Sequence, residues 1–202
     1  MEQLFSYLDA IEEQNSCLAG MKRLYLYPGM EFRSEIKWWP DIGMRVTPHE
    51  GVDICYYIDS TGKECRVTPE FRVPVMAAGR IMAISKDYLG ETVFLDHQYE
   101  KPSRFLSIYA HITPLPDLKI GDKVCAGDVI GTIADTAGKK NRIPAHLHIS
   151  LMTIAKVVPA EKFDWHMISY PEDAKLIDPL KMLDTKKVEF RSKNHWKELF
   201  GL

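Results

Sequence analysis

The chain lacks the features of several common protein classes. Its 202 residues carry 26 basic and 28 acidic side chains, which gives a formal charge of −2. Basic residues are not clustered with aromatic residues, and no glycine-rich phosphate loop of the Walker or dinucleotide type occurs. Because nucleic-acid-binding domains are usually strongly basic, this pattern argues against nucleic-acid and nucleotide binding.

Long apolar runs are also missing. No stretch approaches the roughly 18 apolar residues of a membrane span. The first residues include Asp9, Glu12 and Glu13, whereas a secretory signal has a basic start and an unbroken apolar core. By sequence alone we therefore expect a soluble, cytoplasmic protein without an export signal.

Cysteine is scarce and forms no recognised pattern. Cys17, Cys55, Cys65 and Cys125 form no Cys-x-x-Cys pair and no zinc-ribbon spacing. We expect inert thiols in a reducing compartment. A disulfide between Cys55 and Cys65 remains an alternative, because they flank a predicted hairpin turn at residues 59–62.

The remaining composition is that of an ordinary globular protein, with 46% hydrophobic and 27% charged residues. Near-helical spacing of apolar residues predicts an amphipathic helix over residues 2–18, packed on the outside of the domain. After the break at Pro28-Gly29, short runs rich in Val, Ile, Tyr and Phe begin near Val46.

These runs predict eight short strands, which favours a mainly β protein, an antiparallel sandwich or open barrel. The predicted strands are Val52–Ile58, Glu64–Val67, Val73–Ala77, Arg80–Ser85, Thr92–Asp96, Phe105–His111, Val129–Ala134 and His146–Met152. Residues 155–180 look loop-rich, and residues 196–200 carry a short helical signal.

Two histidines near the end of this β region stand two residues apart, at positions 146 and 148. In a strand, residues i and i+2 point to the same face, about 6.5–7 Å apart. His49 and Asp53, four residues apart, offer a nitrogen and a carboxylate oxygen, both good zinc ligands. Together with His148 they make a three-ligand set with a free position for water, as in catalytic zinc sites. His146 and His111 are candidates for handling protons.

The order of motifs resembles that of the LytM/lysostaphin-type zinc metallopeptidases, peptidase family M23. The motifs are His49-x-Gly51-x-Asp53, Tyr109-Ala110-His111, residues 119–131, His146-Leu147-His148 and the closing residues 178–183. The resemblance covers about residues 43 to 183.

The resemblance implies that His49, Asp53 and His148 bind one zinc ion per chain, and that His111 and His146 are the catalytic histidines. It implies a zinc-dependent endopeptidase with an antiparallel β fold, acting on peptidoglycan stem peptides or cross-bridges, and it favours the cell envelope. We divide the chain into a helical segment (1–25), the peptidase-like domain (26–185) and a tail (186–202).

The chain also departs from the family pattern. Arg142–Ala145 replace a glycine-containing turn, and Ser150 replaces a common glutamate. An insertion of about residues 153–177 precedes the closing motif. We expect it either to form a wall of the groove or only to pack against the sheet. Tyr109, Trp165 and Tyr170 are the candidate substrate contacts.

Two other classes of protein fit the sequence less well. A non-catalytic, regulatory relative would be expected to lack metal ligands, yet the ligand set here is complete. A lipoyl- or biotinyl-carrier module would present lysine in Met-Lys-Met or Asp-Lys-Ala, and neither tripeptide occurs.

Overall fold

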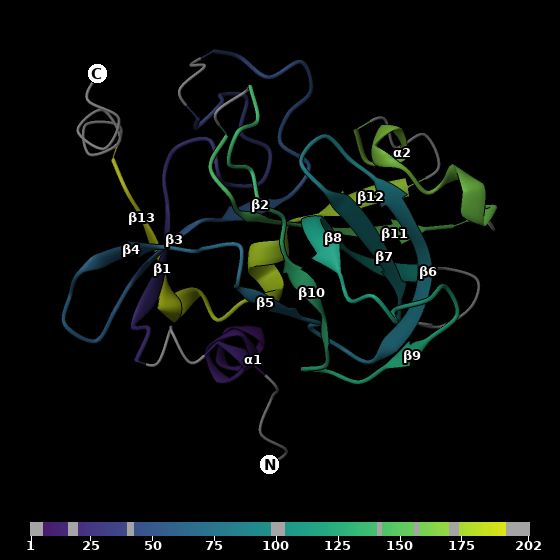
Figure 1. Ribbon diagram of the computed structural model, residues 1–202. Coiled ribbons are helices and arrows are strands. Elements are labelled where there is room, and N and C mark those ends of the chain that lie inside the picture. The colour runs from purple at the N-terminus through teal and green to yellow at the C-terminus, as the bar shows by residue number, and fades with distance from the viewer. Residues whose placement is uncertain are drawn as a thin grey trace.

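The computed structural model describes residues 6–15, 20–39, 43–97, 104–140, 143–155, 158–169 and 174–192. Its strands form a large and a small sheet that lie side by side (Figure 1). The large sheet has the order β12-β11-β8-β7-β6-β9, with β2 on β11, and β10 joining β5 to β8. Its strands are β2 (Val52–Ile54), β5 (Arg72–Pro74), β6 (Gly79–Lys86), β7 (Glu91–Asp96), β8 (Arg104–Pro114), β9 (Lys123–Val124), β10 (Val129–Ile133), β11 (Leu147–Ile154) and β12 (Ala174–Ile177).

The small sheet has the order β13-β1-β3-β4. Its strands are β1 (Arg23–Leu26), β3 (Tyr56–Ile58), β4 (Glu64–Arg66) and β13 (Val188–Phe190). Among the described strands, β1 and β13 run parallel and the other pairs are antiparallel. Neither sheet closes into a barrel within the described chain. Because nearly all described strand pairs are antiparallel, the predicted mainly β, antiparallel fold is confirmed.

The predicted strands are all present, with small differences at their ends. Val52–Ile58 is divided at Cys55 into β2, which belongs to the large sheet, and β3, which belongs to the small one. The sequence patterns did not predict β1, β9, β12 and β13, which are short. The division into domains stays a prediction, and the helical signal at 196–200 lies outside the described residues.

The N-terminal helix α1 spans Tyr7–Gln14, and residues 1–5 and 16–19 of the predicted helix lie outside the described chain. The Ser6 hydroxyl caps it by accepting a hydrogen bond from the backbone N–H of Asp9. At its other end the Asn15 amide donates to the Arg72 carbonyl and accepts from the Arg72 N–H, at 2.9 and 2.7 Å. These bonds attach α1 to β5.

Both faces of the large sheet are covered. Along β7, Val93 and Leu95 point into the core shared with α1, while Phe94 points to the opposite face. That opposite face is covered by Phe163 and Ile168 from the insertion. Because β-strand side chains alternate, each face buries its own apolar set.

The insertion contains more regular structure than the sequence predicted. Two 3₁₀ turns, 179–182 and 185–187, follow it, and within it lie a turn at 160–162, helix α2 (Trp165–Ser169) and strand β12. Strand β12 pairs antiparallel with β11, from Leu151 opposite Ile177 to Ile154 opposite Ala174. It therefore extends the large sheet at its edge (Figure 1).

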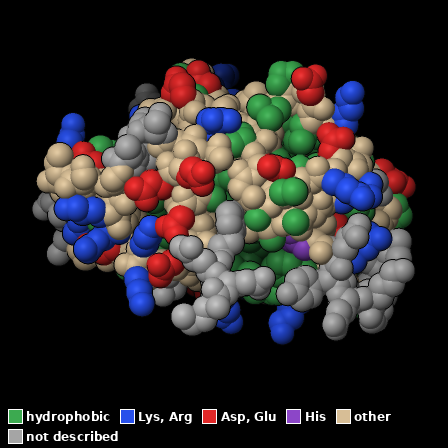
Figure 2. Space-filling model, turned by 90° about the horizontal axis from the view of Figure 1, so that it is seen from below, with side chains coloured by type: hydrophobic (Ala, Val, Ile, Leu, Met, Phe, Trp, Pro, Cys, Tyr) green, Lys and Arg blue, Asp and Glu red, His purple; other side chains and the backbone are tan. Residues whose placement is uncertain are grey.

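The structure describes three of the four cysteines and the distribution of charge on one face. Cys55, Cys65 and Cys125 are free thiols, and in the β3–β4 hairpin Cys65 lies opposite Tyr57 rather than Cys55. Acidic and basic side chains are interspersed on the face seen in Figure 2. Among the described residues, no helix is both long and apolar enough to cross a membrane.

Candidate metal centre

Strand pairing brings the predicted ligands together. Strand β2 pairs antiparallel with β11, and in this register Asp53 lies directly opposite His148. His49 reaches the same point because the chain before β2 runs very close to β11 at Gly51. A Cβ atom at Gly51 would lie 2.1 Å from the Ile149 carbonyl oxygen and 2.7 Å from His148 Nε2. Only glycine fits there, which explains its place between the two ligands.

The three candidate ligand atoms converge. His148 Nδ1 lies 2.9 Å from Asp53 Oδ1, and His49 Nε2 lies 3.1 Å from His148 Nδ1 and 3.2 Å from Asp53 Oδ1. In a tetrahedral zinc site with bonds of about 2.0–2.1 Å, ligand atoms are about 3.3 Å apart. All three side chains are buried. The geometry and donor types fit a zinc ion.

Outer hydrogen bonds select the nitrogen that each histidine presents. His49 Nδ1 donates to the Glu31 carbonyl at 3.0 Å, which leaves Nε2 unprotonated in the neutral ring. His148 Nε2 lies 2.7 Å from the Ser150 hydroxyl oxygen, so Nδ1 is the ring nitrogen that faces the cluster. Such outer partners orient the rings of metal-binding histidines. Ser150, a departure from the family pattern, thus has a role in the site.

Asp53 is held from the side away from the cluster. The Trp38 indole N–H donates to Asp53 Oδ2 at 2.6 Å, and an Arg45 guanidinium nitrogen lies 3.7 Å from the same oxygen. Burial alone would raise the pKa of Asp53. The close contacts with His49, His146 and His148 outweigh burial and lower that pKa well below its usual range. The carboxylate is therefore ionised, with Oδ1 directed at the cluster.

His146 lies beside the candidate metal position. Its Nδ1 donates to the Pro144 carbonyl at 2.7 Å, and its Nε2 lies 3.6 Å from Asp53 Oδ1. Burial, which is only partly offset by the charge of Asp53, lowers the pKa of His146 to about 3. The ring is therefore neutral at pH 7, and the hydrogen bond to Pro144 places its proton on Nδ1 and leaves Nε2 without one.

His111 occupies a distorted position in β8. Glu91 pairs with Ile112 but Val93 pairs with Tyr109, so β8 has one extra residue at this point, a β-bulge. The backbone of His111 has φ +63°, a left-handed conformation that side chains rarely adopt. The bulge directs the ring toward His146, and the two ring centres are 4.9 Å apart.

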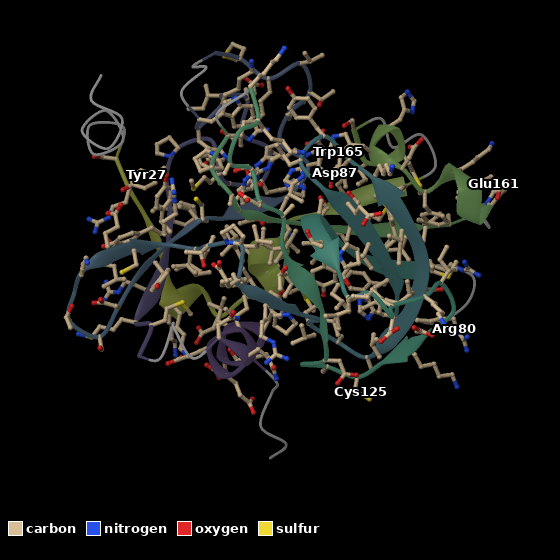
Figure 3. The ribbon with its side chains drawn as sticks, viewed as in Figure 1. Tyr27, Arg80, Asp87, Cys125, Glu161 and Trp165 are labelled. Atoms are coloured by element: carbon tan, nitrogen blue, oxygen red, sulfur yellow. The ribbon has the colours of Figure 1, made fainter. Side chains whose placement is uncertain are left out.

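The cluster lies at the base of a cavity of about 750 Å³. Trp165 of α2 forms part of its wall, stacked on His111 with ring centres 5.3 Å apart and set edge-on to His148 at 5.2 Å. Figure 3 shows Trp165 next to Asp87 at one end of the large sheet, with Cys125 and Arg80 at the other. The remaining lining includes Lys37, Trp39, Arg45, Val46, Thr47, Glu50, Lys86, Tyr88, Leu89, Ile143 and Ser169.

The structure brings five predicted site residues to the cavity, namely His49, Asp53, His111, His146 and His148, and also Trp165. Tyr109 is not at the cavity. It is fully buried, and its hydroxyl accepts hydrogen bonds from the Met76 N–H and the Ser107 hydroxyl. Tyr170 lies outside the described residues.

Trp38 and Asp87 were not predicted. Trp38 lies in a segment without a motif, and Asp87 reads in the sequence only as a turn residue. Their roles depend on contacts between segments that are distant in sequence, which no local pattern reveals.

Together, the fold and the donor set define an antiparallel β protein with a buried three-ligand candidate metal centre. The model of "Peptidase family M23" matches residues 47–160, more than half of the chain. The chain belongs to peptidase family M23. No curated protein matches it by sequence.

Solved structures with some similarity include two of lysostaphin and one of the SpoIIIAH–SpoIIQ complex. The solution structure of lysostaphin is 19% identical, with a TM-score of 0.45, over 70% of this chain and 45% of lysostaphin. The catalytic domain of lysostaphin from Staphylococcus simulans is 20% identical, with a TM-score of 0.42, over 66% and 77%. The structure of the SpoIIIAH–SpoIIQ complex is 16% identical, with a TM-score of 0.45, over 77% of this chain and 90% of the matched chain. The chain thus spans less than half the length of the first of these proteins.

Proposed function

We propose that this protein is a zinc-dependent endopeptidase that hydrolyses peptide bonds in peptidoglycan, in stem peptides or cross-bridges. The observation that carries the proposal is the convergence of His49 Nε2, Asp53 Oδ1 and His148 Nδ1 within 2.9–3.2 Å of one another, at the base of a cavity. Three protein ligands with an open position are typical of catalytic zinc sites.

The ligand residues would hold one zinc ion per chain, through the nitrogens left free by Glu31 and Ser150. When bound, zinc polarises a substrate carbonyl and makes water acidic enough to supply a hydroxide near pH 7. Asp53 contributes a single oxygen, because Trp38 occupies the other. The site therefore keeps an open position toward the cavity.

The two remaining histidines handle protons. His146 presents an unprotonated Nε2 beside Asp53, because its Nδ1 donates to the Pro144 carbonyl, and Nε2 is thus placed to take a proton from the attacking water. His111, 4.9 Å away between ring centres, can donate to the oxygen that becomes negative or to the departing amine once its Nε2 carries a proton. Both residues line the cavity, as contact with substrate requires.

The insertion forms one wall of the substrate groove. Trp165 lines the cavity against His111 and His148, and an indole face suits a peptide or sugar ring. Helix α2 is fixed to the ligand loop, because Glu50, next to His49, accepts hydrogen bonds from the Ser169 and Thr47 hydroxyls at 2.7 and 3.0 Å. This wall would narrow the range of accepted peptides. A peptidoglycan substrate would require the protein at the cell envelope.

The test is digestion of purified peptidoglycan by the zinc-loaded protein, with new amino termini identified by labelling and mass spectrometry. Wild type should release them and should contain one zinc per chain. H146A should keep its zinc yet lose about 10²–10⁴ in rate, because general acid–base assistance is typically of that size. Zinc-loaded wild type that releases no amino termini from peptidoglycan contradicts the proposal.

A further inference from the structure

The turn between β6 and β7 contacts His111 through Asp87, which also lines the cavity. In this turn the Asp87 N–H donates to the Gly90 carbonyl at 2.9 Å. The turn packs directly on β8, since a Cβ at Gly90 would lie 2.7 Å from the Ile112 carbonyl oxygen and 3.3 Å from the His111 carbonyl carbon. Asp87 is thereby placed against the bulge that carries His111.

The Asp87 carboxylate binds His111 at two points. Its Oδ1 accepts from the imidazole Nδ1 at 3.1 Å, and its Oδ2 accepts from the His111 backbone N–H at 2.9 Å. The side chain of Asp87 is almost completely buried, at 1% exposure. One carboxylate thus holds both the ring and the left-handed backbone of the residue that lines the cavity.

The rest of the turn holds the carboxylate in place. Oδ1 also accepts from the N–H groups of Leu89 and Gly90, at 2.8 and 2.7 Å, and Oδ2 accepts from the Thr92 hydroxyl at 2.8 Å. Burial alone would raise the pKa of Asp87, but the hydrogen bonds and charge of His111 and the Gly90 N–H lower it well below its usual range. The group is therefore a fixed anion at neutral pH.

We propose that Asp87 is the positioning residue for His111. Its carboxylate accepts a hydrogen bond from the ring Nδ1, fixes the ring orientation, and leaves Nε2 for the cavity. A buried carboxylate behind a histidine plays the same part in hydrolases that use a Ser-His-Asp triad, without itself taking the proton. The inference deepens the proposed function and rests on it for the catalytic consequence only.

A matched control exists in the β3–β4 hairpin. Asp59 Oδ1 also accepts hydrogen bonds within its own turn, from the N–H groups of Thr61 and Lys63 at 2.8 and 3.0 Å. Asp59 is not among the residues that line the cavity. D59N therefore measures the loss of a turn carboxylate alone, whereas D87N measures this loss together with the effect on His111. D87S is a second variant, because serine can still cap the turn but is too short to reach His111.

The experiment measures zinc content, kcat and KM on peptidoglycan fragments, and the imidazole ¹⁵N shifts of His111 in the zinc-loaded proteins. In wild type and D59N the shifts should report a proton on Nδ1. D87N and D87S should keep one zinc per chain and a KM within about threefold of wild type. Their kcat should fall at least tenfold, as for other partners behind catalytic or metal-binding histidines, and in D87S the His111 ring should lose its single tautomer.

Two results would overturn the proposal. One is an unchanged His111 spectrum in D87S, and the other is a kcat in both variants within threefold of wild type. If wild type itself cuts no peptidoglycan, the proposed function fails, while the ¹⁵N spectra of wild type and D87S still decide whether Asp87 sets the tautomer of His111.

Discussion

The stretch that matches the family model and the segments on either side of it meet at the same cavity. Residues 47–160 supply His49, Asp53 and His148 as well as His111 and His146. The preceding segment supplies Trp38, which hydrogen-bonds to Asp53, and the carbonyl of Glu31, which hydrogen-bonds to His49. The following segment supplies Trp165, which contacts two of the histidines from the cavity.

The two regions contribute differently to the site. The matched region has the atoms that would bind metal and move protons, together with Ser150, Pro144 and Asp87, which hold three of the histidines. The flanking segments add further contacts to Asp53 and His49 and shape the groove. We therefore expect substitutions of the candidate metal-binding and proton-transfer residues to abolish function, and substitutions in the flanks to change affinity and selectivity.

The largest effect should follow from loss of a ligand. H148A removes one of three donors, and it leaves His49 and Asp53 without the neighbour that shares the cluster. After dialysis against metal-free buffer and back-titration, elemental analysis should find almost no zinc. H97Q is the control, since His97 bonds to Ala78 and Ser107 away from the cavity and this variant should keep its zinc. Full zinc occupancy in H148A would exclude His148 as a ligand.

A smaller effect on zinc binding is expected from substitution of Trp38, in the segment before residue 47. W38F keeps an aromatic ring in the core but removes the N–H that binds Asp53 Oδ2. Losing such an outer partner typically costs about 10–100-fold in metal affinity. Competition with a chromophoric chelator measures the zinc Kd.

The neighbouring W39F provides the control for W38F. The Trp39 ring lies against Arg45, with 4.9 Å between the guanidinium carbon and the ring centre. In the described part of the chain it is Trp38, and not Trp39, that donates to Asp53. Its zinc Kd should stay close to that of wild type. Equal affinities in W38F and W39F would show that the flank does not tune the site.

The metal-free protein should lose stability in mild acid because of His146. Burial lowers the pKa of His146 to about 3 in the folded state, against about 6.5 when unfolded. Between these values the unfolded state binds the extra proton, so stability is full above pH 6.5 and falls as the pH decreases toward 3. The contribution of this group is at most about 1.4 kcal/mol per pH unit.

Urea unfolding at pH 7.5, 5.5 and 4.5 measures this slope. H146Q should show a shallower dependence than wild type, because glutamine does not titrate. Burial also lowers the pKa of His97, so H97Q measures how much of the slope comes from a histidine outside the cavity. If the unfolding free energies of wild type and H146Q depend on pH in the same way, His146 is not the group that destabilises the folded protein in acid.

Much of the fold could be predicted because the matched region has strong local patterns. Short runs rich in Val, Ile, Tyr and Phe indicated most strands of the large sheet, and the His-x-His and His-x-Gly-x-Asp spacings indicated the cluster. The missed strands β9 and β13 are short, and β12 lies in a segment that looked loop-rich. Their pairing depends on β6, β1 and β11, respectively, and not on their own sequence.

The support of the site was harder to predict for the same reason. Asp87 is 24 residues from His111 in the sequence, and Trp38 is 15 residues from Asp53. Neither pair has a spacing that signals contact in a strand or helix. Tyr109 is an example of a local motif that misled the prediction. Its place in the motif with His111 suggested a contact in the groove, but the bulge in β8 leaves its side chain in the core.

The smallest effect should come from the insertion, in which Phe163 and Trp165 point in different directions. Phe163 is buried against Phe94, with ring centres 5.4 Å apart, whereas Trp165 lines the cavity. The insertion therefore both packs on the sheet and forms a wall. Deleting all of it would also remove β12 from the sheet, so single substitutions give the cleaner test.

W165A should keep its zinc and its thermal stability within a few degrees, because the indole is only partly buried. It should change the relative rates on different peptidoglycan fragments by several-fold, since the wall beside His111 is lost. F163A should do the reverse, with a loss of about 3–5 kcal/mol in unfolding free energy, as for other buried phenylalanines, and an unchanged fragment profile. Rates on a panel of purified muropeptides, together with urea unfolding, distinguish the two variants. If W165A cuts the panel in the same proportions as wild type, the insertion contributes packing and β12 to this fold but no selectivity.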